Sequence, residues 1–373
     1  MSIRIASLLP MLLSPFLALA PVQAAPAPDF SKLDQVVKSG IGRDPAGGVS
    51  VAMVRGGKVI GEAHYGFADS TSRRRPDSQT IYRIGSVSKA FTAVMLLQLV
   101  ERGTVRLTDR AERYLPELRR LKGRSPHSPP ITLIQLATHT AGLPGEPDVP
   151  GFDKGPAAQW EKRLLAALPA TAYASEPGTR FAYSNLGYAM LALALSRAAR
   201  EPYPDYLRRH VFLPLGMVDT GFAIGSADRG RLALGYAVAD GKADAAQAQS
   251  ELAGRGYKLP VGGAFTTLKD MAQFVSFQMG DGPAGILKPE TLALWPRLLE
   301  TVDPGMGQGY GVGFQLFTNG DVVLRGHTGG LPGYRALEAF DPESKTGFIV
   351  LRNALGGRFG DPVMMVFSAF EQR

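Results

Sequence analysis

Hydrophobic residues form strand-like segments at both ends of the chain. Near the N-terminus, GVSVAMVR (48–55) and KVIGEAHYGFA (58–68) are joined by Gly56-Gly57, which predicts a β-hairpin. Near the C-terminus, DVVLRG (321–326), YRALEAF (334–340) and TGFIVLR (346–352) are separated by turn-forming residues and predict three more strands. The amphipathic segment 361–372 predicts a final helix that packs on a sheet.

The middle of the chain has helical and loop-rich patterns instead. Helical segments are expected at 131–142, 157–168, 184–200, 203–216 and 266–280. Segment 237–256, AVADGKADAAQAQSELAGRG, approaches low complexity and is predicted to be a surface loop. Together these patterns predict an α+β fold, in which N- and C-terminal strands share one antiparallel sheet flanked by helices. A helical subdomain over roughly residues 105–255 would be inserted into this single domain, 25–373.

The first 24 residues have the pattern of a secretory signal peptide. Arg4 supplies the positive charge, residues 5–20 form the apolar region, and Val22-Gln23-Ala24 places small residues at the cleavage position. An uncleaved membrane anchor is the alternative, but the apolar run is short and contains Pro10 and Pro15. We therefore expect a periplasmic or secreted protein with no stable membrane span after cleavage.

Composition narrows the possible chemistry. The 373 residues include no cysteine, which excludes thiol catalysis and thiolate metal sites. The five histidines show no paired metal spacing, so no metal or cofactor is expected. The formal charge of +8 comes from scattered basic residues without interleaved aromatics, and a nucleic-acid partner is therefore not expected.

Ser86 and Lys89 stand three residues apart at the start of an apolar segment, Ala90 to Val100. On a helix they share one face. Lys89 could take the serine proton if burial lowered its pKa, and the apolar continuation would supply that burial. The alternative is an ordinary helix cap, because about 0.7 such Ser-x-x-Lys pairs would arise by chance in a chain of this composition.

Two further motifs contain candidate site residues. Tyr183 and Asn185 form a Tyr-x-Asn triplet where a Pro-Gly turn leads into an apolar helix; Asn185 could be only a cap. Near a lysine ammonium, Tyr183 would have a lowered pKa and could shuttle protons. His327-Thr328-Gly329-Gly330 follows the predicted strand 321–326, where glycines permit close backbone approach, although a plain turn is also possible.

The order Ser-x-x-Lys, Tyr-x-Asn, His-Thr-Gly resembles the serine hydrolases that include class C β-lactamases, D-alanyl-D-alanine carboxypeptidases of the penicillin-recognising type and related esterases. ITLIQLATHTAGLP, EPGTRFAYSNLGYAMLALAL, PLGMVDTGF, GGAFTTLKDMAQF and GYGVGF are also similar to stretches of that family, so the resemblance covers nearly the whole mature chain. His139, in ATHTAG, is expected to be structural.

This resemblance implies a role for each matching position. Ser86 would be the nucleophile, Lys89 its proton partner and Tyr183 a second acid/base. Backbone N–H groups of Ser86 and Gly330 would form the oxyanion hole. The substrate contacts it implies are Asn185, His327, Thr328 and Gly329.

Two departures from the family pattern affect the expected substrate. Class C β-lactamases usually have Lys-Thr-Gly, whereas this chain has His327, expected to be charged only below about pH 6.5. Glu146 stands where β-lactamases tend to have a glutamine, and is expected to disfavour anionic acyl side chains.

The sequence therefore predicts a serine hydrolase of the D,D-peptidase or esterase type, acting on a small-molecule or peptidoglycan-derived substrate through an acyl-enzyme. A class C-like β-lactamase and a non-hydrolytic penicillin-binding sensor of cell-wall fragments are the alternatives. No Gly-x-Ser-x-Gly elbow is present, which argues against an α/β-hydrolase.

Overall fold

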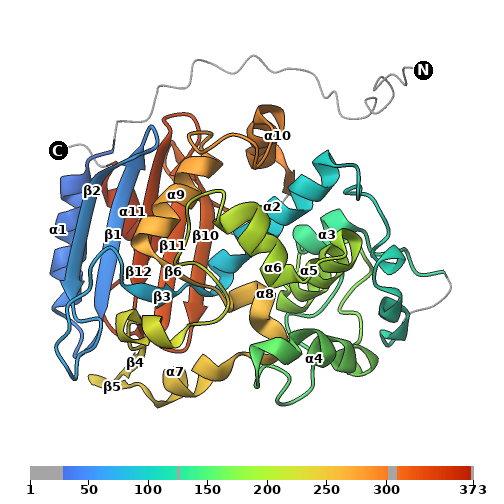
Figure 1. Cartoon of the computed structure of the whole chain (residues 1–373), viewed down its shortest axis with the longest axis horizontal. Helices are drawn as coiled ribbons and strands as arrows, with labels where there is room; N and C mark the ends of the chain where they lie inside the picture. Colours follow the sequence, from blue (N-terminus) through green and yellow to red (C-terminus); the bar gives the residue numbers. More distant parts are fainter. Residues whose placement is uncertain (1–27, 124–126, 301–308, 371–373) are drawn as a thin grey trace.

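The computed structural model describes residues 28–123, 127–300 and 309–370. The predicted signal peptide lies outside the described residues. The main feature is an eight-stranded sheet with the order β2-β1-β12-β11-β10-β9-β8-β7 (Figure 1). Its strands are β1 (Gly48–Arg55), β2 (Lys58–Gly66), β7 (Leu299–Glu300), β8 (Tyr310–Gly311), β9 (Gln315–Asn319), β10 (Val322–Leu331), β11 (Tyr334–Asp341) and β12 (Thr346–Arg352).

The sheet joins the two ends of the chain, as the sequence predicts. β1 pairs antiparallel with β12, from Val49 opposite Arg352 to Arg55 opposite Thr346. The β1–β2 hairpin turns at Gly56 and Gly57, whose φ angles of 54° and 73° lie in the left-handed region that glycine enters without strain. The structure confirms the predicted α+β class and the predicted antiparallel sheet that joins N- and C-terminal strands.

Side chains along each strand point alternately to the two faces of this sheet. Both faces are apolar, so helices cover both. α1 (Phe30–Ile41) and α11 (Pro362–Ser368) pack on one face, where the alternating side chains of Val49, Val51 and Met53 are buried. α9 (Leu268–Gln278) covers the other face, where Ala336 and Phe340 are buried, and α2 (Ser88–Glu101) packs mainly against other helices in the same hydrophobic core. The predicted C-terminal helix is therefore present and packs as expected.

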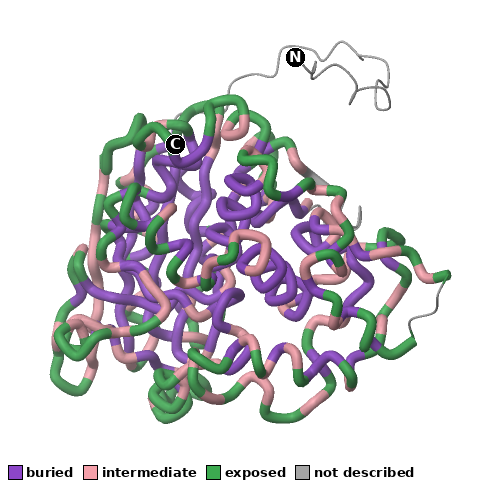
Figure 2. The backbone as a smooth tube through the Cα atoms, turned by 45° about the vertical axis from the view of Figure 1, so that its right-hand side comes forward, coloured by how far each residue is buried: buried purple, intermediate pink, exposed green. Residues whose placement is uncertain are grey.

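The remaining helices lie beside the sheet (Figure 1). They are α3 (Leu133–Ala137), α4 (Trp160–Ala167), α5 (Asn185–Ala199), α6 (Tyr203–Leu207), α8 (Leu259–Gly262) and α10 (Pro289–Leu294). α2 and α5 are buried along most of their length, and the exposed backbone lies mainly in the surrounding loops (Figure 2). Among the described residues, no helix is both long and apolar enough to cross a membrane.

Segment 237–256 lies mostly at the surface, as predicted, but it is not the loop that its composition predicts. It contributes to β4 (Tyr236–Ala239) and contains β5 (Lys242–Asp244), α7 (Ala246–Ser250) and a 3-10 turn at Glu251–Ala253. β4 pairs with β13 (Ala354–Gly356), so long-range pairing stabilises a segment whose own sequence specifies little. A two-stranded sheet of β3 (Ile81–Arg83) and β6 (Phe265–Thr267) leads into the segment that carries Ser86.

Candidate active site

The nucleophile candidate lies in a sharp turn between β3 and α2. Gly85, with φ 54°, begins a 3-10 turn, Gly85–Val87, that leads directly into α2. The Ser88 hydroxyl donates to the Gly85 carbonyl at 2.7 Å and closes the turn. Ser86 is thereby held at the entrance of the helix, with Lys89 on its first turn.

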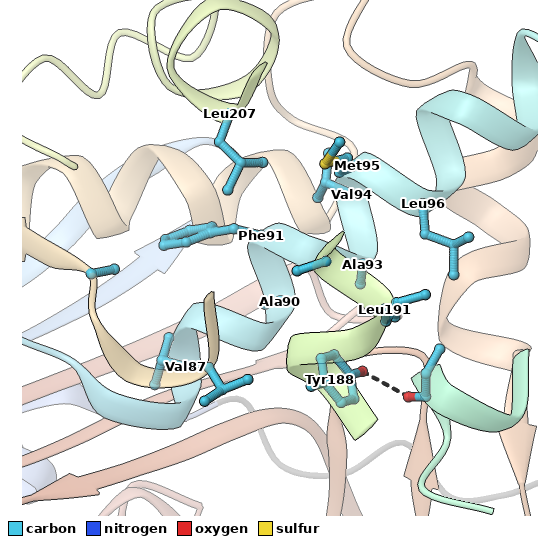
Figure 3. Packing of buried hydrophobic residues seen from close by; sticks show 14 of the residues in the cluster. Val87, Ala90, Phe91, Ala93, Val94, Met95, Leu96, Tyr188, Leu191 and Leu207 are labelled. Carbon is cyan, nitrogen blue, oxygen red and sulfur yellow. Dashed lines mark hydrogen bonds between the residues drawn. The ribbon is translucent and has the colours of Figure 1, made fainter. Parts of the chain in front are cut away.

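α2 is buried on all sides, which explains its unbroken apolar sequence. Every residue from Ser88 to Leu99 is buried. Figure 3 shows the α2 side chains packed against Tyr188 and Leu191 of α5 and Leu207 of α6. Burial on all sides fixes the position of α2 and removes the Lys89 side chain from water, as the sequence predicts.

Three atoms surround the Lys89 amine. Nζ lies 3.1 Å from Ser86 Oγ, 2.7 Å from Asn185 Oδ1 and 3.3 Å from the Val261 carbonyl. The Asn185 oxygen and the Val261 carbonyl can only accept hydrogen bonds, so each of them takes one N–H group of the Lys89 amine. A neutral amine then has one lone pair left, directed at the Ser86 hydroxyl.

Electrostatics favour this neutral form. Burial lowers the pKa of Lys89 well below its ordinary value, and the nearby cations Arg255 and Lys258 lower it further, while Glu146 opposes them. Lys89 can therefore accept the Ser86 proton, which an ammonium could not do.

Tyr183 lies beside this pair, but its expected pKa shift is wrong. The Lys89 Nζ is 4.8 Å from the centre of the Tyr183 ring, and the phenol hydrogen-bonds with Ser86. Burial raises the pKa of Tyr183 above its ordinary value, because a phenolate would be poorly solvated, and the negative charge of Glu146 raises it further. The raised pKa of Tyr183 favours the neutral phenol, and the lowered pKa of Lys89 favours the neutral amine.

Asn185 begins α5 and connects the amine to a charged pair. Its Oδ1 accepts from Lys89, and its Nδ2 donates to Glu146 Oε1 at 2.8 Å. Lys258 Nζ lies 2.9 Å from the same Glu146 oxygen. Glu146 is therefore compensated by Lys258, which weakens the expected repulsion of anionic acyl groups.

β10 forms the opposite side of the nucleophile turn. A Cβ on Gly329 would lie 1.8 Å from the Ile84 carbonyl oxygen and 3.3 Å from Ser86 N, so glycine permits this close approach. Gly330 lines a cavity of about 360 Å³ together with Ser86. Other residues of the cavity wall are Glu146, Asn185, Arg255, Lys258, Val261 and Leu331.

His327 and Thr328 lie within β10, where they have partners in the protein. The His327 Nδ1–H donates to the Thr328 carbonyl at 2.6 Å, and Nε2 accepts from the Tyr310 hydroxyl at 3.0 Å. Burial holds the pKa of His327 down to about 3, so the expected titration near pH 6.5 is wrong. Thr328 donates its hydroxyl to Gln315 Oε1 at 3.0 Å. Neither residue contributes to the wall of the cavity that Ser86 lines.

His139 has the structural surroundings that the sequence analysis expects. It is buried with φ 60°, and its Nδ1 accepts from the Ser184 N–H at 2.9 Å. Its ring lies 4.3 Å from that of Tyr183, measured between centroids. His139 thus fixes the backbone and the ring beside the nucleophile.

Arg255, Lys258 and Val261 were missed by the sequence analysis. They lie just before and within α8, and their contribution depends on a fold that brings residue 261 to residue 89. The pair of cations in RGYK was the only local signal, and it does not differ from a solvated surface pattern. In the described part of the chain, no cluster of three histidine, aspartate or glutamate residues is placed to hold a metal ion.

Comparisons with known proteins identify relatives of this chain. Protein flp of Staphylococcus aureus (strain MW2) is 25% identical over 325 residues, covering 86% of this chain and 62% of its own length. D-alanyl-D-alanine-carboxypeptidase/endopeptidase AmpH of Escherichia coli (strain K12) is 34% identical over 179 residues, which are 48% of this chain and 46% of AmpH. This chain thus spans less than two thirds of either relative.

A solved structure shows the same fold. The octameric penicillin-binding protein homologue from Pyrococcus abyssi superposes with a TM-score of 0.76 at 24% identity, covering 91% of this chain and 76% of that one. The sequence profile described as Beta-lactamase matches residues 33–364, nearly all of the described chain. The protein belongs to the Beta-lactamase family.

Proposed function

We propose that this protein is a serine hydrolase that forms an acyl-enzyme on Ser86, with D,D-peptidase or esterase activity. One observation supports the proposal above all others: the buried Lys89 amine, whose pKa burial lowers well below its ordinary value, lies 3.1 Å from the Ser86 hydroxyl. A serine is a weak nucleophile unless an adjacent base accepts its proton. The retained Tyr183 beside both groups argues against a dead site.

The proposed reaction assigns a step to each group. Ser86 Oγ attacks the acyl carbon while its proton passes to Lys89 Nζ, and backbone N–H groups of Ser86 and Gly330 stabilise the negative carbonyl oxygen. The bond to the leaving amine or alcohol then breaks, and that group departs with a proton delivered from Lys89 or through Tyr183. Water hydrolyses the acyl ester and restores the Ser86 hydroxyl.

Peptides, esters and β-lactams all pass through this same intermediate. AmpH, the relative named above, is a carboxypeptidase/endopeptidase, which favours a peptidoglycan-derived D-alanyl peptide as substrate. His327, buried and neutral in place of the lysine of class C β-lactamases, argues against an efficient β-lactamase. Such a substrate, together with the predicted signal peptide, supports a location in the periplasm or outside the cell.

Covalent labelling tests the nucleophile. Wild-type protein should be labelled by a fluorophosphonate and by a fluorescent penicillin, and Ser86→Ala should abolish both reactions while its circular dichroism spectrum stays unchanged. Ser184→Ala is the matched control and should still be labelled. Equal labelling of wild type and Ser86→Ala would refute the assignment.

Substrate choice is tested by parallel assays. A D-Ala-D-Ala peptide, a short-chain nitrophenyl ester and a chromogenic cephalosporin are compared by kcat/KM, and we expect the cephalosporin to be the poorest substrate. A penicillin adduct that persists for hours without turnover of any of the three substrates would favour the penicillin-binding sensor instead.

A further inference from the structure

The Lys89 amine is connected to the edge of the cavity by a continuous set of contacts. Lys89 Nζ donates to Asn185 Oδ1 at 2.7 Å, Asn185 Nδ2 donates to Glu146 Oε1 at 2.8 Å, and Lys258 Nζ lies 2.9 Å from that oxygen. The contacts join residues that are 39 to 112 positions apart in the sequence.

We propose that Glu146 and Lys258 are positioning residues for the acylation step, which act on Lys89 through the Asn185 amide. Glu146 fixes which end of the amide faces Lys89, and Glu146 and Lys258 have opposite, balancing effects on the pH range over which Lys89 is an effective base. This inference rests on the proposed function and adds two residues to the machinery of the same site.

Orientation of the amide is the first part of the argument. An asparagine side chain can present either its oxygen or its NH₂ group to a neighbour. Glu146 is a carboxylate and only accepts, so it binds the NH₂ group and turns Oδ1 toward Lys89. Reversal of the amide would present N–H groups to Lys89, remove one acceptor from the amine and disturb the lone pair directed at Ser86.

Charge is the second part. Titratable groups face Lys89 from several elements, but most are neutral. The rings of Tyr183 and Tyr188 lie 4.8 and 5.7 Å from Nζ, and burial raises the pKa of both phenols. The neighbouring histidines are buried, with lowered pKa values: His139 before α5 and His327 on β10.

The groups that remain charged near Lys89 are therefore one anion and two cations. Glu146 raises the pKa of Lys89, and Arg255 and Lys258 lower it. Arg255 lies outside the hydrogen-bonded series and pairs with Glu251 at 2.8 Å. Glu146 and Lys258 have opposite charges and are in contact, so their effects on Lys89 should largely cancel.

The test measures the acid limb of the pH profile for single-turnover acylation by a neutral nitrophenyl ester. Glu146→Gln keeps an acceptor for Asn185 but loses the negative charge, so the acid limb should move to lower pH, by about one pH unit. Lys258→Gln should move it to higher pH by a smaller amount. The double variant Glu146→Gln/Lys258→Gln should lie between the single variants, near wild type.

Two further variants separate charge from position. Glu146→Ala loses the acceptor as well as the charge, so its maximal acylation rate should fall at least tenfold below that of Glu146→Gln. Lys345→Gln is the control: it removes an exposed lysine that pairs with Asp281 and belongs to none of the contacts around Lys89. This variant should leave the pH profile unchanged. Shifts of the same sign in Glu146→Gln and Lys258→Gln, or no shift in either, would overturn the proposal.

A second readout does not depend on catalysis. In the Ser86→Ala background, titration of ¹³C-labelled lysine by NMR follows the Lys89 amine directly, and the same opposite displacements are expected on adding Glu146→Gln or Lys258→Gln. Displaced titrations, combined with a Ser86-containing protein that hydrolyses none of the three substrates, would support this inference and refute the proposed function. If the protein that keeps Ser86 is active and neither variant displaces the Lys89 titration, the proposed function is supported and this inference is overturned.

Discussion

Ser86 lies between two sides of a cavity that are built in different ways. On the side of α2 and α5, Lys89 and Tyr183 contact the hydroxyl and Asn185 contacts Lys89, and under the proposed function the first two transfer protons. On the side of β10, the backbone approaches through Gly329 and Gly330, while the neighbouring polar side chains bond within the protein. The first side therefore depends on residue chemistry, and the second depends on the absence of side chains.

The largest loss of acylation rate is expected for variants on the side of α2 and α5. Lys89→Met and Tyr183→Phe should each slow acylation by about 10² or more, the usual consequence of losing a positioned acid or base. The double variant should lose less than the product of the two, because both groups act on the one Ser86 proton. Stopped-flow acylation by a neutral ester measures this, and fully multiplicative losses would show that the groups act independently.

On the backbone face, two adjacent glycines provide a matched pair. Gly329→Ala should force β10 away from Ser86, because the new Cβ would lie 1.8 Å from the Ile84 carbonyl oxygen. We expect a loss of stability of about 1–3 kcal/mol and at least a tenfold loss of acylation rate. Gly330→Ala, whose Cβ would meet no atom within 4 Å, should fold with nearly wild-type stability.

Urea denaturation of both glycine variants, together with their acylation rates, checks this contrast. Equal stability and equal activity in the two variants would mean that close approach of β10 at Gly329 is not required.

A buried acid behind β10 should affect stability rather than catalysis. Glu338 on β11 stands opposite His327 in the sheet register and bonds to Gln278 at 3.3 Å. Burial raises the pKa of Glu338 from 4.5 to about 8. A raised pKa means that the folded state holds the proton more tightly, so its stabilising contribution is complete below pH 4.5 and is lost as pH rises through 8.

Glu338→Gln should remove this dependence, which amounts to about 1.4 kcal/mol per pH unit between the two pKa values. Urea denaturation of wild type and variant at pH 5 and pH 8 measures it. The variant should gain stability relative to wild type at pH 8, and parallel losses in both proteins would contradict a protonated Glu338.

The smallest effect is expected for His327. With its pKa near 3, it is neutral over the working range and cannot give a carboxylate substrate a pH-dependent advantage. The ratio of kcat/KM for an anionic ester to that for its neutral analogue should therefore show no step near pH 6.5. A clear rise of that ratio below pH 6.5, absent from His327→Gln, would restore the histidine as a substrate contact.

Sequence patterns predicted β1, β2, β10, β11 and β12 of the sheet, and the motif order singled out Ser86, Lys89 and Tyr183, which lie close together in the structure, because strand periodicity and motif order are local properties. They indicated that burial would lower the pKa of Lys89, but they did not predict the pKa shifts of two neighbouring groups. The pKa shifts of Tyr183 and His327 depend on burial by distant segments, and sequence reasoning gave the wrong direction for the first and an unperturbed value for the second. They also missed Lys258, whose role follows from the tertiary contact with Glu146.

The central claim is that Lys89 is a neutral amine in the resting protein. NMR titration of wild-type protein with its 12 lysines labelled at ¹³Cε tests this directly, with the Lys89 signal assigned by its absence from Lys89→Met. We predict a Lys89 transition well below 10.5, the ordinary lysine pKa. A transition near 10.5 would show an ammonium at neutral pH, which cannot accept the Ser86 proton, and would contradict the account.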